Sequence, residues 1–137
     1  CPNAIKEILY RAADRTQRSV TLIANHYIQT PKSKYIHFSQ VPPGFDVADD
    51  EIVKRVESGD LVITSDIPLA ADVIKKQCVA INFRGELYTD ENITARLQMR
   101  NFMETLRTSG VETGGQSPLS HKDRQYFAAQ LEKMLSQ

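Results

Sequence analysis

Apolar residues along this chain occur in two patterns, a helical spacing of three to four residues and short continuous runs. The spacing predicts helices, and the runs, which are bounded by glycine, proline or polar residues, predict buried strands. The expected helices cover residues 2–16, 47–57, 67–76, 90–108 and 121–135. The expected strands cover residues 19–24, 35–41, 61–64 and 78–83. A loop is expected over residues 110–120, which contain Gly114, Gly115 and Pro118.

Strands that alternate with helices are typical of an α/β domain with a mostly parallel sheet. Right-handed crossovers place helices on both faces of such a sheet, so we expect three layers. The two C-terminal helices should pack on one face or extend the domain, and they are also candidates for contact in a homodimer. Because 137 residues is an ordinary domain length, we expect a single domain over residues 1–137.

Composition and charge indicate the class of protein and its cellular compartment. The chain is 41% hydrophobic and 25% charged, as soluble globular domains are. Lys+Arg and Asp+Glu both total 17, and this zero net charge does not favour a strongly basic nucleic-acid surface, although a local patch stays open. Two cysteines are too few for a disulfide scaffold, so we expect a cytoplasmic protein. No apolar run approaches the roughly 20 residues that span a membrane.

Acidic side chains are expected to gather at the carboxyl ends of the strands, where open α/β sheets bind ligands. Asp66 directly follows the apolar run 61–64. Asp46, Asp49 and Asp50 begin the preceding helix at a spacing that places them on one face. Because Mg²⁺ and Mn²⁺ prefer carboxylate oxygens from several elements, these four acids form a candidate metal site, with Asp66, Asp49 and Asp50 as catalytic candidates.

The same acids have an ordinary structural interpretation. Asp46 and Asp66 stand at expected helix N-caps, and Asp49 is the acid of a variant capping box. Repulsion of about 0.2–0.5 kcal/mol per pair is comparable with the roughly 0.3–1 kcal/mol gained by an acid near a helix N-terminus. The cluster therefore needs no metal to persist. Two carboxylates alone make a weak site, so a metal site here requires a further acid before Cys1.

Three polar residues are candidate substrate contacts. Asn25 and Arg84 follow expected strands, and Arg100 lies on the helix over 90–108. Arg100 and its neighbouring arginines, Arg96 and Arg107, are more simply explained as a solvated helix face. Cys1 precedes a helix, where a thiol pKa is lowered, so a thiol enzyme is a third possibility.

Several segments together resemble the bacterial YaiI/YqxD family over nearly the whole chain. They are Val41-Pro-Pro-Gly-Phe-Asp-Val-Ala-Asp-Asp50, Gly59-Asp-Leu-Val-Ile-Thr-Ser-Asp-Ile-Pro-Leu-Ala70, Arg84-Gly-Glu-Leu-Tyr-Thr89, Arg96-Leu-Gln-Met-Arg-Asn-Phe-Met103 and Thr113-Gly-Gly115. The family is largely uncharacterised and is similar to PIN-like domains. Many PIN domains are Mg²⁺- or Mn²⁺-dependent ribonucleases with clustered acids at the strand ends.

This resemblance implies roles for individual residues. Asp66 matches the PIN-type acid after a strand, and Asp49 or Asp50 matches the helix acid. Family members usually begin with a strand that runs into Asp-Ala-Asp-Ala-Cys-Pro, whereas this chain begins at the corresponding Cys1-Pro2. We therefore expect the biological protein to carry a further N-terminal strand, central in the sheet, with two more acids.

The resemblance and the edge acids together predict a metal-dependent ribonuclease, a hydrolase that cleaves phosphodiester bonds in RNA. The alternative is a non-catalytic module of the same fold that binds nucleic acid or a protein partner, because fold alone does not fix function.

Overall fold

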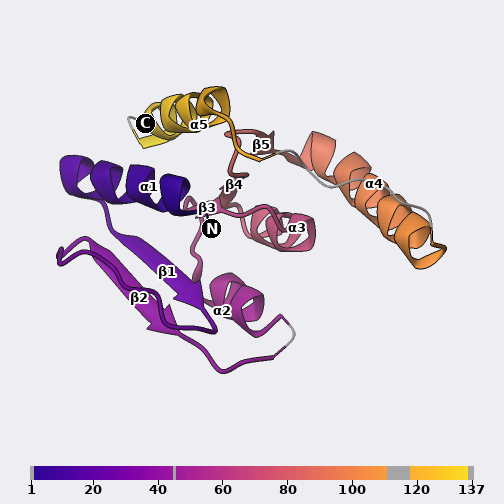
Figure 1. Cartoon of the computed structure of the whole chain (residues 1–137), viewed down its shortest axis with the longest axis horizontal. Coiled ribbons are helices and arrows are strands. Elements are labelled where there is room, and N and C mark those ends of the chain that lie inside the picture. Colours follow the sequence, from indigo (N-terminus) through magenta and orange to yellow (C-terminus); the bar gives the residue numbers. More distant parts are fainter. Residues whose placement is uncertain (1, 45, 111–117, 136–137) are drawn as a thin grey trace.

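The computed structural model describes residues 2–44, 46–110 and 118–135 (Figure 1). Its helices are α1 (Asn3–Thr16), α2 (Val47–Arg55), α3 (Ile67–Lys75), α4 (Asp90–Thr108) and α5 (His121–Leu135). Its strands are β1 (Val20–Ala24), β2 (Ile36–Gln40), β3 (Leu61–Ile63), β4 (Val79–Ile81) and β5 (Leu87–Tyr88). The expected helices and the four expected strands are confirmed, and β5 was not predicted. None of the helices in these ranges is long and apolar enough to cross a bilayer.

The strands form two small sheets rather than one. β1 pairs with β2 in parallel, with Val20 opposite Ile36. β4 lies between β3, to which it is parallel, and β5, to which it is antiparallel. Within the described ranges no ladder joins β1 to β3. The α/β class and the mostly parallel pairing are thus confirmed, but the single continuous sheet is not seen.

β5 exists because the chain reverses tightly after β4. The Asn82 side-chain oxygen accepts hydrogen bonds from the backbone N–H groups of Arg84 and Glu86, both at 2.9 Å. Gly85 adopts a φ of 84°, which favours glycine. Asn-x-x-Gly between two short apolar runs is turn chemistry, so the Arg84-Gly85 segment was a hairpin signal and not merely the end of a strand.

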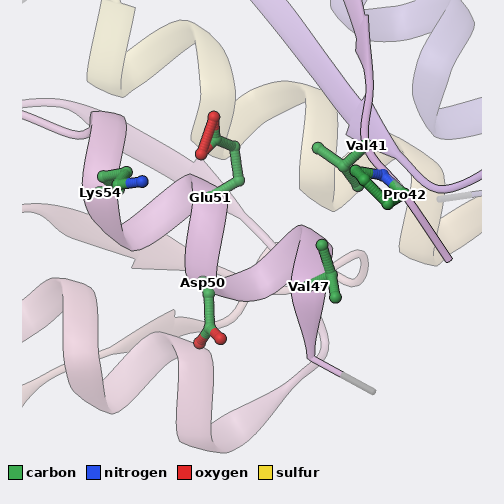
Figure 2. A pocket seen from close by; sticks show the side chains of 6 residues that line it. All are labelled: Val41, Pro42, Val47, Asp50, Glu51 and Lys54. Carbon is green, nitrogen blue, oxygen red and sulfur yellow. The ribbon is translucent and has the colours of Figure 1, made fainter. Parts of the chain in front are cut away.

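Helix α2 lies at the carboxyl end of the β1–β2 pair. The chain leaving β2 stays beside β1, since the Val41 N–H donates to the Ala24 carbonyl at 2.9 Å. Arg55 of α2 donates to the Ser39 hydroxyl at 3.0 Å. A hollow of about 280 Å³ lies between this chain and α2 (Figure 2), lined by Val41, Pro42, Val47, Asp50, Glu51 and Lys54.

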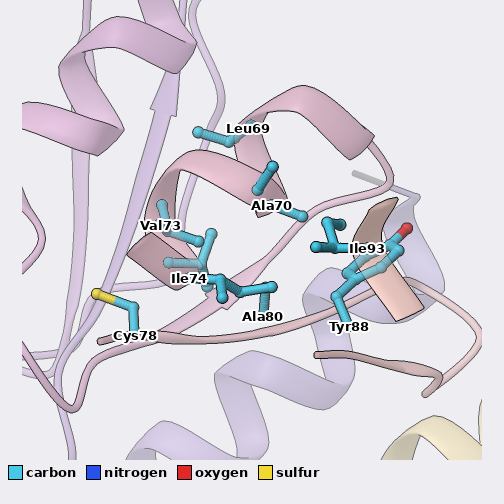
Figure 3. Packing of buried hydrophobic residues seen from close by; sticks show 10 residues of the cluster. Leu69, Ala70, Val73, Ile74, Cys78, Ala80, Tyr88 and Ile93 are labelled. Atoms are coloured by element: carbon cyan, nitrogen blue, oxygen red, sulfur yellow. The ribbon is translucent and has the colours of Figure 1, made fainter. Parts of the chain in front are cut away.

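The core has two parts, one on each face of the β3–β4–β5 sheet. On one face, buried side chains of α3 pack over Ala80, Tyr88 and Ile93 (Figure 3). On the other, Ile81 packs with Phe127 of α5 and with buried residues of α1. Neighbouring residues of β4 therefore serve opposite faces, as strand geometry requires. This gives the expected three layers, with α3 and α4 on one side and α1 and α5 on the other.

Candidate acidic site at the carboxyl ends of the strands

Asp66 connects β3 to α3 and caps the helix. Its Oδ1 accepts a hydrogen bond from the Leu69 N–H at 2.9 Å, and its own N–H donates to the Thr64 hydroxyl at 3.0 Å. The backbone of Asp66 is extended, as an N-cap requires, and Pro68 follows in the first turn. The predicted cap is confirmed. It employs the Oδ1 oxygen of the carboxylate.

Asp49, in the first turn of α2, lies beside Asp66, so the two acids come from different elements. Partial burial, then repulsion from Asp66 and a hydrogen bond between the two side chains, together raise the pKa of Asp49 to about 6. The charges of Asp46 and Asp50 contribute less. A carboxyl pair of this kind resists double ionisation, so it retains a proton up to about pH 6 unless a cation takes its place.

Asp46 and Asp50 affect the charge of Asp49 less than Asp66 does. Asp46 stands at the N-cap of α2, but its side chain accepts no capping hydrogen bond. The capping alternative is therefore wrong for Asp46, because its backbone is left-handed, with φ 60°, rather than extended. Asp50 is exposed on the hollow beside α2, and it points away from the neighbouring Glu51 (Figure 2).

The acids that the structure brings together fall short of a complete metal cage. Across residues 2–44, 46–110 and 118–135, no group of three or more His, Cys, Asp or Glu side chains is arranged to hold a metal ion. Asp49 and Asp66 form the close pair, with Asp46 and Asp50 near enough to affect its charge. Two carboxylates fit a hard cation that keeps several of its waters, as Mg²⁺ does.

The three candidate substrate contacts lie on separate parts of the fold. Arg84 forms an ion pair with Asp123 of α5 at 2.5 Å, which ties the β4–β5 turn to that helix. Hydrogen bonds from Ser120, followed by the nearby arginines, lower the pKa of Asp123. Arg100 pairs with Glu104 along α4 at 3.3 Å, consistent with a solvated helix face. Asn25 is exposed just after β1.

Two further expectations fall outside the described residues. Cys1, the proposed reactive thiol, is one, and the Gly114-Gly115 part of the predicted loop is the other.

One feature of the charge distribution was not predicted. Residues 15–45 contain four basic side chains, Arg15, Arg18, Lys32 and Lys34, and no acidic one. The rest of the chain holds 13 basic and 17 acidic residues, so positive and negative charges are unevenly distributed along the chain although its net charge is zero. Counting charges by segment, instead of over the whole chain, would have found it.

Comparison with known proteins agrees with the motifs. The model of an uncharacterised family, YaiI/YqxD, matches residues 1–137. UPF0178 proteins of Pectobacterium carotovorum and Colwellia psychrerythraea are 61% and 59% identical over 137 residues, all of this chain and 91% of each relative. A UPF0178 protein of Hydrogenovibrio crunogenus is 60% identical over 136 residues, 99% of this chain and 90% of that protein. No solved structure matches the chain.

Proposed function

The chain belongs to the uncharacterised YaiI/YqxD family, and from this premise we propose that it is a metal-dependent phosphodiesterase acting on RNA. The Asp49–Asp66 pair is the observation that carries the proposal. The two carboxyls come from different elements, and the pKa of one is raised to about 6; perturbed pKa values of this kind cluster at functional sites. The resemblance of the family to PIN-like domains, many of them ribonucleases, supports the same reaction.

The chemistry proposed for the pair is simple. Mg²⁺ or Mn²⁺, when bound, supplies water activation and stabilises negative charge on the phosphate during in-line attack. Asp49 and Asp66 would each give an oxygen to the cation, which would keep several of its waters. The Leu69 N–H bond to Asp66 holds that carboxylate in place, so that little reorganisation is needed.

The test is cleavage of a panel of RNAs by the protein with Mn²⁺, compared with Asp49→Asn and Asp66→Asn. Asparagine also caps helices, so Asp66→Asn keeps the cap of α3 while removing the charge. We expect both variants to lose nearly all cleavage. Asp72→Asn, at an exposed position of α3, is the matched control and should cleave normally. Full cleavage by Asp66→Asn contradicts the proposal.

A second candidate function, a non-catalytic binding module, is favoured by the incomplete cage within the described residues. Cation binding separates the two. A cation that binds only the folded protein raises the free energy of unfolding by about 2.7 kcal/mol when its concentration is a hundred times Kd. The phosphodiesterase therefore predicts that Mn²⁺ raises the melting temperature of the protein and leaves that of Asp66→Asn unchanged. Equal response of both proteins favours the module.

A further inference from the structure

We propose that residues 17–44, which contain β1, β2 and the chain around them, bind single-stranded nucleic acid next to the Asp49–Asp66 pair. This names the form of substrate for the proposed phosphodiesterase and rests on that function, but binding itself can be measured without metal.

Charge is the first argument. Residues 17–44 contain three basic side chains, Arg18, Lys32 and Lys34, and no acidic one, and they surround one strand pair. Arg15 belongs to the last turn of α1, where it pairs with Glu132, and the Asp14 carboxylate accepts a hydrogen bond from the Ser33 hydroxyl between the two lysines. Lys32 and Lys34, in the connection from β1 to β2, are both exposed. Phosphate groups are attracted to this unit and repelled by the net acidic remainder of the chain, so the uneven division favours one location for a nucleic acid.

An exposed aromatic side chain is the second argument. Tyr27 is 72% exposed, more than the other large hydrophobic side chains of the described ranges. Its ring meets that of Phe38 edge to face, with centroids 6.0 Å apart. This contact supports the ring of Tyr27 while most of its surface stays open to solvent. Such a ring offers a base a stacking surface, which only an unpaired base can use.

Position is the third argument. Tyr27 comes three residues after Ala24, the last residue of β1, and therefore lies near the carboxyl end of that strand. The same end adjoins α2, because α2 contacts β1 and the Val41 N–H bonds to Ala24. Asp49 stands in the first turn of α2. A strand that stacks a base on Tyr27 thus lies on the side of the molecule that carries the acids.

The test is binding of a labelled oligouridylate of about 12 nucleotides in EDTA, followed by fluorescence anisotropy over a range of salt concentrations. We expect Tyr27→Ala to weaken binding about 5-fold or more, because one stacked base is lost. Tyr27→Phe keeps the ring and should bind as the original protein does. Lys32→Gln with Lys34→Gln should weaken binding and reduce the salt slope by about 1.4.

Matched control variants change residues of α3, α4 and α5, outside the proposed binding segment. Phe102→Ala removes an aromatic ring that is 58% exposed on α4, and Lys75→Gln with Lys122→Gln removes two exposed charges from α3 and α5. All should bind normally. Unchanged binding by Tyr27→Ala, or equal affinity for a duplex of the same length, overturns the inference.

Failure of this inference and failure of the proposed function have different signatures. If the oligonucleotide binds in a Tyr27-dependent way but is never cleaved with Mn²⁺, the binding site stands and the phosphodiesterase does not. If RNA is cleaved in an Asp66-dependent way while Tyr27→Ala leaves KM unchanged, the phosphodiesterase stands and the binding site does not.

Discussion

Asp49 makes the stability of the protein depend on pH. Its pKa in the folded state, about 6, lies above the ordinary value of 3.8, so the folded state holds this proton more tightly than the unfolded state does. Stability from this group is therefore fully present below pH 3.8, falls as the pH rises through 6 and is lost above it. The acid pair costs folding energy at neutral pH, where a metal site would be needed.

Asp49→Asn should remove this cost. In EDTA at about pH 7.5 we expect the variant to be more stable than the original protein by on the order of 1 kcal/mol, a value reduced for solvent screening of a partly exposed group. Near pH 4 the two proteins should be equally stable. Urea unfolding at both pH values measures this, with Asp72→Asn as control. A variant that is less stable at pH 7.5 would show that the Asp49 carboxylate is structurally required.

Residues were predicted with uneven success. Asp66 was identified as both N-cap and candidate ligand, because one local pattern, an apolar run followed by Asp-x-Pro, determines its position. The left-handed backbone of Asp46 has no comparable local signal. The Arg84–Asp123 pair joins residues 39 positions apart, and no spacing rule predicts such a contact.

Among the elements, the packing of α5 depends on Gly85 in the β4–β5 turn. A Cβ at Gly85 would lie 2.7 Å from Tyr126 Cδ2 and 3.0 Å from the Phe127 Cα, closer than atoms pack. Gly85→Ala should therefore push α5 away from the sheet and destabilise the protein by roughly 2 kcal/mol or more, from overpacking added to backbone strain.

Gly110→Ala separates these two causes. Gly110 has nearly the same φ, 85° against 84°, but a Cβ there meets nothing within 4 Å. Its cost should be backbone strain alone, about 1–2 kcal/mol. Thermal unfolding of both variants gives the comparison. If they lose the same stability, α5 does not press on Gly85 as the structure indicates.

At the scale of the whole molecule, the two sheets should differ in stability. The β3–β4–β5 sheet has a buried cluster on each face, whereas β1 and β2 contribute no residue to either cluster. Segments with fewer buried apolar contacts open at lower free energy. Native-state hydrogen exchange should therefore be slower for the shared hydrogen bonds of β3 and β4 than for those of β1 and β2. Equal protection in both sheets would mean that the molecule opens as one unit.

The order and type of nearly all elements could be read from the sequence, because apolar spacing reflects burial directly. The division into two sheets could not. Strand pairing depends on which backbone edges meet in space, and the runs over residues 19–24 and 61–64 look alike whether or not they share a sheet. β5 was missed for a related reason, since two residues carry too little periodicity to register as a strand.

The split between the sheets has a consequence for how the protein behaves in a test tube. β3 is an apolar strand, Leu61-Val62-Ile63, with a ladder partner on one side only within the described ranges. Strands of this kind recruit other chains, and flanking charges are what hold such chains off. Asp60 and Asp66 flank β3 on either side. Asp66, which we propose as a cation ligand, therefore also opposes aggregation of the protein. During storage, a solution of the Asp66→Asn variant should scatter more light than a solution of the Asp49→Asn variant.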